Sequence, residues 1–133
     1  MRSLTAAAAL VVLVTLSGCS SGNEDAATRA AEQLHSSLRA EDGAGACDLL
    51  SDDAQKELAE SEGASCATAV MDAGLPDSGK VVDVEVYGTA AQVHFADDED
   101  VVFLGEFTDG WKVTAAGCSR QAGAPYDCQV QGG

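Results

Sequence analysis

The spacing of apolar residues changes near residue 76, and this change limits the chain to folds in which helices precede strands. Before the segment Pro76-Asp77-Ser78-Gly79, apolar residues such as Ala27, Ala31 and Leu34 follow the helical spacing of about 3.6 residues. After it, apolar and polar residues alternate, as in residues 82–87. All six aromatic residues lie in this second part. We therefore expect an α+β domain with its aromatic side chains on a sheet.

Four helical segments are predicted in the first part. The first starts after a cap at Asn23 or Asp25 and ends at Gly43, because glycine is common just past the last helical turn. A short helical turn is expected over residues 44–50, and a last helix over about 65–73.

Ser51 is the predicted N-cap of the third helix, which ends near Gly63. Asp52 and Asp53 would then lie in its first turn, where the helix dipole favours acidic side chains. This local role explains the acidic pair without any catalytic function.

The second part predicts a curled four-stranded antiparallel sheet on which the helices pack. The strands lie at residues 82–87, 91–95, 101–107 and 111–116, and tight turns at Gly88-Thr89 and Thr108-Asp109-Gly110 join the pairs. Residues 117–133 are expected to form a loop pinned by a disulfide.

Alternation along these strands predicts one apolar face, which the helices must cover. Its members are Val82, Val84, Val86, Ala91, Val93, Phe95, Phe103, Phe107, Trp111 and Val113. A two-residue turn at Gly88-Thr89 would place Asp83 opposite His94 on the other, solvent-facing side. Because the titratable groups then lie outside, no sheltered catalytic cleft is expected.

Four cysteines, Cys47, Cys66, Cys118 and Cys128, predict two disulfides in a small exported domain. Three pairings are possible, and we favour Cys47–Cys66 and Cys118–Cys128, in which each bridge stays within its own half of the chain. Zinc binding is the alternative, but the chain has no C-x-x-C motif and no paired histidines. We expect no metal ligands and no cofactor.

Two features of the sequence are candidate functional sites. His35 lies beside the apolar stripe of the first helix and is interpreted as a surface or flanking histidine rather than a ligand or base. The acidic run Asp97–Asp100 is interpreted as a solvated hairpin turn, with calcium binding as the alternative, because the EF-hand spacing is absent. No catalytic motif is present, so we expect no catalytic residues.

The N-terminus resembles that of bacterial lipoproteins. A basic residue, Arg2, comes before an uncharged stretch of thirteen residues, 4–16, and Leu16-Ser17-Gly18-Cys19 at its end resembles a lipobox. The resemblance implies that residues 1–18 are a signal peptide and that Cys19 carries a diacylglyceryl group. Residues 19–25 would form a lipidated tether, and 26–133 a single domain on the extracytoplasmic face of the cell membrane. The alternative is an ordinary signal peptide.

The charge of the chain is strongly acidic. Its formal net charge is −15, and loss of Arg2 would make it −16, with six bases facing 22 acids. Nucleic acid is therefore excluded as a partner, because its phosphates require Lys and Arg. Contact with anionic membranes is expected only through the lipid anchor.

The order of helices and sheet resembles the cone-shaped fold of the nuclear-transport-factor-two-like superfamily. Two segments, Ala46-Cys47-Asp48-Leu49-Leu50 and residues 110–118, also resemble small actinobacterial lipoproteins that have this cystatin-like cone. The resemblance implies no assigned activity. The superfamily includes isomerases and hydrolases with acidic or histidine groups inside the cone, whereas the inward positions predicted here are apolar.

From the sequence, we expect a membrane-anchored lipoprotein that acts as an extracytoplasmic binding or interaction domain. Its partner would be an envelope protein or a small apolar ligand. The alternative is a small-ligand carrier or an enzyme that uses an apolar pocket between helices and sheet. A cavity near 300 Å³ with convergent polar groups would favour a small ligand.

Overall fold

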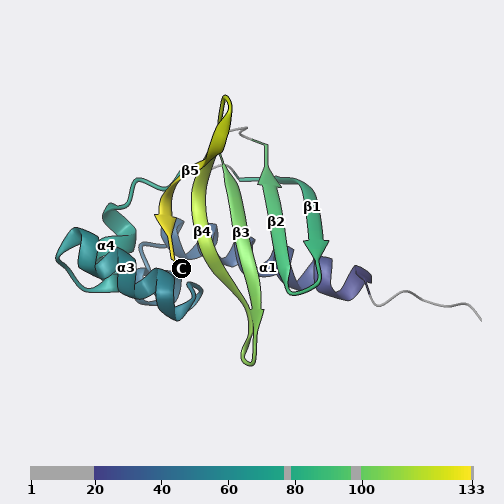
Figure 1. The fold of residues 1–133 in the computed structure, drawn as a ribbon. Coiled ribbons are helices and arrows are strands. Elements are labelled where there is room, and N and C mark those ends of the chain that lie inside the picture. The colour runs from purple at the N-terminus through teal and green to yellow at the C-terminus, as the bar shows by residue number, and fades with distance from the viewer. Residues whose placement is uncertain (1–19, 77–78, 97–99, 133) are drawn as a thin grey trace, which may run out of the picture.

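The computed structural model describes residues 20–76, 79–96 and 100–132, and within these it is an α+β fold. Four helices are followed by a five-stranded, open antiparallel sheet whose strand order is the chain order, β1-β2-β3-β4-β5. Figure 1 shows the longest helix running across one face of the sheet, with the short helices gathered beside its β5 edge.

The helices are α1 (Ser20–Arg39), α2 (Gly43–Asp48), α3 (Asp52–Glu62) and α4 (Cys66–Asp72). The cap of α3 is confirmed, because the Ser51 hydroxyl accepts a hydrogen bond from the Ala54 amide at 3.3 Å. Gly63 ends this helix with a φ of 64°, in the left-handed region that suits glycine.

The beginning and end of α1 differ from the prediction. The expected tether over residues 20–25 is the first part of the helix, which therefore starts at Ser20. Glu41, with a φ of 56°, makes the reversal after α1 that was assigned to Gly43. Gly43 instead starts α2, at a point where a Cβ atom would overlap the carbonyl oxygen of Ala67. Glycine there lets α2 and α4 approach closely.

The strands are β1 (Val81–Tyr87), β2 (Ala90–Phe95), β3 (Val101–Phe107), β4 (Gly110–Gln121) and β5 (Ala124–Gln131). The predicted β1–β2 register is confirmed: Tyr87 pairs with Ala90, Glu85 with Gln92 and Asp83 with His94. Gly88, with a φ of 60°, occupies the turn between them.

A fifth strand replaces the expected C-terminal loop. β4 extends to Gln121, and β5 returns along it, so that Cys118 lies directly opposite Cys128. The disulfide joining these two residues is therefore a cross-strand bridge, and Gly123, with a φ of 69°, lies in the turn. The second disulfide, Cys47–Cys66, joins α2 to α4.

The predicted faces of β3 are wrong. Val102 and Leu104 enter the core, whereas Phe107 is 47% exposed and Phe103 packs edge-on against Tyr126 of β5. In β1, Val82 lies at an irregularity in the register and is exposed instead of buried.

The core lies between α1 and the inner face of the sheet. α1 contributes small side chains at Ala27, Ala30 and Ala31, so that it packs close to the strands. The sheet contributes its largest buried side chain, Trp111. The remaining buried sheet residues include Ala91, Val93, Phe95, Val102, Leu104 and Val113. The described interior between helix and sheet is thus filled by apolar side chains.

Candidate functional site

His35 is buried near the end of α1, which corrects its interpretation as a surface histidine. Its Nε2 atom lies 3.2 Å from Oδ2 of Asp100, and the side chains of the two residues are 4% and 1% exposed. The imidazole also stacks on the ring of Phe95, with centroids 4.2 Å apart. A charged or strongly polar pair is thus held inside an otherwise apolar fold, where desolvation alone would disfavour it.

Asp100 is also buried, which corrects its interpretation as part of a solvated turn. It directly precedes β3, and its carbonyl oxygen accepts a hydrogen bond from the Phe95 amide at 3.1 Å. This backbone bond places Asp100 beside the last residue of β2, and so beside the ring on which His35 stacks. The other residues of the acidic run, 97–99, lie outside the described residues.

A cavity of about 260 Å³ opens beside His35. It lies between the end of α1, α4 and the segment that follows α4. Its lining consists of His35, Leu38, Arg39, Val70, Met71, Gly74, Leu75 and Pro76. The described lining residues are mostly apolar and include an imidazole and a guanidinium but no carboxylate. Such a surface suits a small apolar molecule with one anionic or hydrogen-bond-accepting group.

A larger hollow of about 570 Å³ lies between the start of α3 and the β3–β4 turn. Its lining is dominated by exposed acids, including Asp52, Asp53 and Asp109. Lys112 bridges it, with Nζ donating to the Asp48 carbonyl oxygen at 2.7 Å and lying 3.5 Å from Asp109. These contacts tie the β3–β4 hairpin to the helices, and we interpret the hollow as a structural junction.

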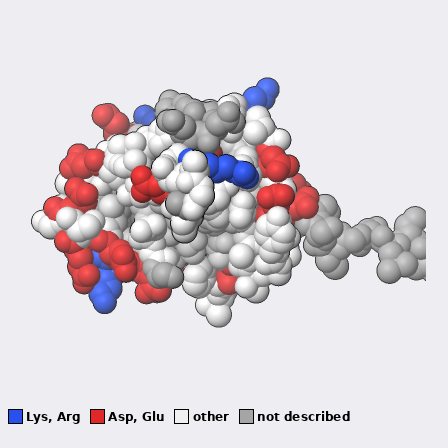
Figure 2. Space-filling model, turned by 45° about the horizontal axis from the view of Figure 1, so that its top comes forward, with Lys and Arg blue, Asp and Glu red and all other residues white. Residues whose placement is uncertain are grey.

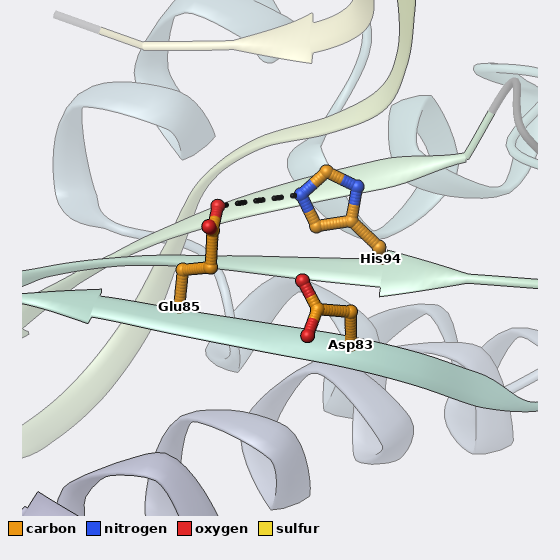
Figure 3. A group of neighbouring side chains, drawn as sticks. All are labelled: Asp83, Glu85 and His94. Carbon is orange, nitrogen blue, oxygen red and sulfur yellow. Dashed lines mark ion pairs between the residues drawn. The ribbon is translucent and has the colours of Figure 1, made fainter.

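Titratable residues also gather on the outer face of the sheet, as predicted for Asp83 and His94. Figure 3 shows the carboxylates of Asp83 and Glu85 reaching from β1 toward the imidazole of His94 on β2. The Glu85 Oε2 atom lies 3.9 Å from Nε2 of His94. The pKa of Tyr87 is raised above its ordinary value of 10.0. The largest cause is the negative charge of Glu85, followed by desolvation, a hydrogen bond with Glu85 and the charge of Asp83.

Acidic side chains also dominate parts of the surface. Figure 2 shows them clustered at the α3–α4 end of the molecule, where blue side chains are few. The α3 acids, which are all exposed, are Asp52, Asp53, Glu57, Glu60 and Glu62.

Sequence reasoning identified the outer-face pair but missed the His35–Asp100 pair. The four cysteines form the two bridges described above, while Cys19, the predicted lipidation site, lies outside the described residues. One signal for the missed pair was available, since His35 falls one residue after Leu34 and so lies on the edge of the apolar stripe.

Comparisons with protein-family models, curated proteins and solved structures find no match to this chain. Among the described helices, none combines the length and apolar character needed to cross a membrane.

Proposed function

We propose that this chain is a lipid-anchored extracytoplasmic domain that binds a small ligand in the cavity beside His35. The observation that carries the proposal is the buried His35, which is paired with Asp100 and lines a cavity whose other walls are mostly apolar. A polar pair is costly to bury, and its position at a cavity gives it a role in orienting a ligand.

The size of the cavity indicates the class of ligand. At roughly 30 Å³ for each water-sized group, a volume of about 260 Å³ holds about nine such groups. The apolar walls would hold a short hydrocarbon segment, and the imidazole of His35 and the guanidinium of Arg39 favour a carboxylate or similar acceptor at one end. A medium-chain carboxylic acid such as octanoate has this chemistry.

The lipid anchor is supported by the sequence Leu16-Ser17-Gly18-Cys19 after an uncharged segment. Two acyl chains at about 0.8 kcal/mol per buried CH₂ would hold the protein firmly to the membrane. Because α1 starts at Ser20, the anchor would join the domain without a flexible linker. The ligand cavity would lie at the far end of α1, because His35 is roughly 22 Å along the helix from Ser20 at about 1.5 Å per residue.

Thermal unfolding in the presence of octanoate and of octanol tests the proposal. A ligand at ten times its Kd stabilises the folded state by about 1.4 kcal/mol, which corresponds to several degrees in Tm for a domain of this size. We expect octanoate to raise Tm in a saturable manner. Arg39→Gln should weaken octanoate binding at least about threefold and leave octanol binding unchanged.

Two tryptophan substitutions on α4 separate the cavity from the rest of the surface. Met71→Trp fills the cavity and should abolish the shift in Tm, whereas Thr68→Trp, an exposed position on the same helix that does not line the cavity, should preserve it. Equal shifts in both variants, or none in the wild type, would refute the ligand proposal. An envelope protein recovered with the intact lipoprotein would then be the better account of its role.

A further inference from the structure

Three side chains with metal-binding atoms meet on the outer face of the sheet, away from the cavity. Asp83 and His94 are cross-strand partners, and Glu85 lies two residues further along β1 on the same face. One potential ligand atom from each residue lies within 4.8 Å of the other two. Figure 3 shows both carboxylates directed toward the same side of the imidazole ring.

The surroundings of the His94 Nε2 atom also suit a metal ligand. The imidazole side chain is 22% exposed, but this particular nitrogen is shielded from solvent and has no hydrogen bond among the described residues. The 3.9 Å separation from Glu85 Oε2 is too long for a hydrogen bond. Nε2 thus faces two carboxylates without a direct hydrogen bond, and a cation bound between the three groups would interact with all of them.

The ligand set identifies the kind of ion. Imidazole together with carboxylates is typical of zinc and related first-row divalent ions, whereas calcium takes six to eight oxygen ligands. In a tetrahedral zinc site with bonds of about 2.1 Å, ligand atoms lie roughly 3.4 Å apart. The atoms here need to approach by roughly 0.5–1.4 Å, and rotation of the two exposed carboxylates provides this movement.

We propose that Asp83, Glu85 and His94 bind a divalent transition-metal ion of the zinc type. Three protein ligands leave the fourth tetrahedral position to water or to an external ligand. The tight turn at Gly88-Thr89 fixes the β1–β2 register and so holds the ligand-bearing backbones in place before the ion binds. This site is separate from the cavity, and its test does not depend on the proposed function.

Calorimetric titration of the metal-free, unacylated full chain with Zn²⁺ is the test, with the Cys19 thiol alkylated because a free thiol would itself bind zinc. We expect one Zn²⁺ per chain and a shift of the His94 imidazole NMR signals on binding. His94→Gln and Asp83→Asn should each weaken binding at least about tenfold, because loss of even an indirect ligand partner has an effect of this size. Ca²⁺ should bind at least about tenfold more weakly than Zn²⁺.

The control removes the same kind of charge elsewhere. Asp53→Asn combined with Glu57→Gln neutralises two exposed acids on α3 and should leave the affinity for Zn²⁺ within about twofold. The proposal is overturned if His94→Gln binds Zn²⁺ as the wild type does, or if the α3 variant loses binding to the same extent. Absence of saturation at concentrations that would half-fill a site with a Kd of about 1 mM would also overturn it.

Discussion

At the scale of single residues, the imidazole of His35 combines an ion pair, a stacked ring and a cavity wall. The carboxylate of Asp100 lies at one nitrogen, the ring of Phe95 stacks on one face, and the cavity opens beside it. The stacking and the ion pair together restrict the ring to one orientation. A histidine held in this way can bind a ligand without first losing side-chain freedom, which lowers the entropic cost of binding.

Phe107 and Leu104 provide a direct comparison of the two faces of β3. Leu104 is 2% exposed and faces Val113, whereas Phe107 is 47% exposed. Leu104→Ala should therefore reduce the free energy of unfolding by about 2–5 kcal/mol, because it opens a cavity in the core. Phe107→Ala should reduce it by less than about 1 kcal/mol. Urea unfolding of both variants measures the difference, and equal losses would show that Phe107 is packed inside.

The pKa of Tyr87 depends on the charges of Asp83 and Glu85 on the outer face of the sheet. Its pKa is raised chiefly by Glu85, because ionisation places a negative phenolate beside a negative carboxylate. Glu85→Gln should therefore lower the pKa of Tyr87 toward 10.0, as measured by NMR of its ring carbons against pH. Glu106→Gln, which removes an exposed acid from β3, is the control. An unchanged Tyr87 pKa in Glu85→Gln would contradict the contact.

At the scale of elements, the short helices α2 and α4 approach each other closely. α2 and α4 are joined by the Cys47–Cys66 bridge, and Gly43 allows their backbones to approach. Closing a loop with a sequence separation of 19 contributes about 3 kcal/mol in the chain-entropy account. The bridge thus offsets the small apolar area that these alanine-rich helices bury.

Two glycine-to-alanine substitutions test this packing. Gly43→Ala should destabilise the fold by about 1–3 kcal/mol, because the new methyl group overlaps the Ala67 carbonyl oxygen. Gly22→Ala, in α1, meets no atom within 4 Å and should be neutral or stabilise by up to about 1 kcal/mol. Chemical unfolding of both variants distinguishes the two effects. A neutral Gly43→Ala would mean that α2 and α4 are further apart.

The elements that the sequence predicts correctly depend on local signals. The Ser51 cap, the Gly63 stop and the Gly88-Thr89 turn each involve residues a few positions apart. The faces of β3 depend on turn length: a two-residue Thr108-Asp109 turn pairs Trp111 with Glu106, so the residues that share its face are Leu104 and Val102. β5 was not predicted because an edge strand pairs with a single neighbour. That neighbour, β4, was predicted to end at residue 116, which left most of β5 without a partner.

At the scale of the whole molecule, the candidate ligand site depends on contacts between distant parts of the chain. His35 on α1 meets Asp100 only because the sheet brings the start of β3 beneath the end of that helix. Local patterns predict which residues form a helix or a strand, but they do not predict which polar residues meet inside the fold. The outer-face pair was predictable because one tight turn places Asp83 opposite His94.

The anchor is tested by substitution of its cysteine. Cys19→Ala should prevent acylation, so that the protein accumulates as an unprocessed precursor or is released from the membrane. Detergent partitioning and mass spectrometry of the membrane fraction measure this. Recovery of the variant as a processed, acylated form would contradict the lipoprotein proposal.

The central claim is that the cavity beside His35 binds a small amphiphilic ligand, and NMR titration with octanoate measures this most directly. We predict saturable shifts for His35, Val70 and Leu75, which line the cavity, and no such shifts for Val84 and Val113, which belong to the sheet. Absence of saturable shifts up to about 10 mM octanoate, or shifts spread evenly over the protein, would contradict the claim.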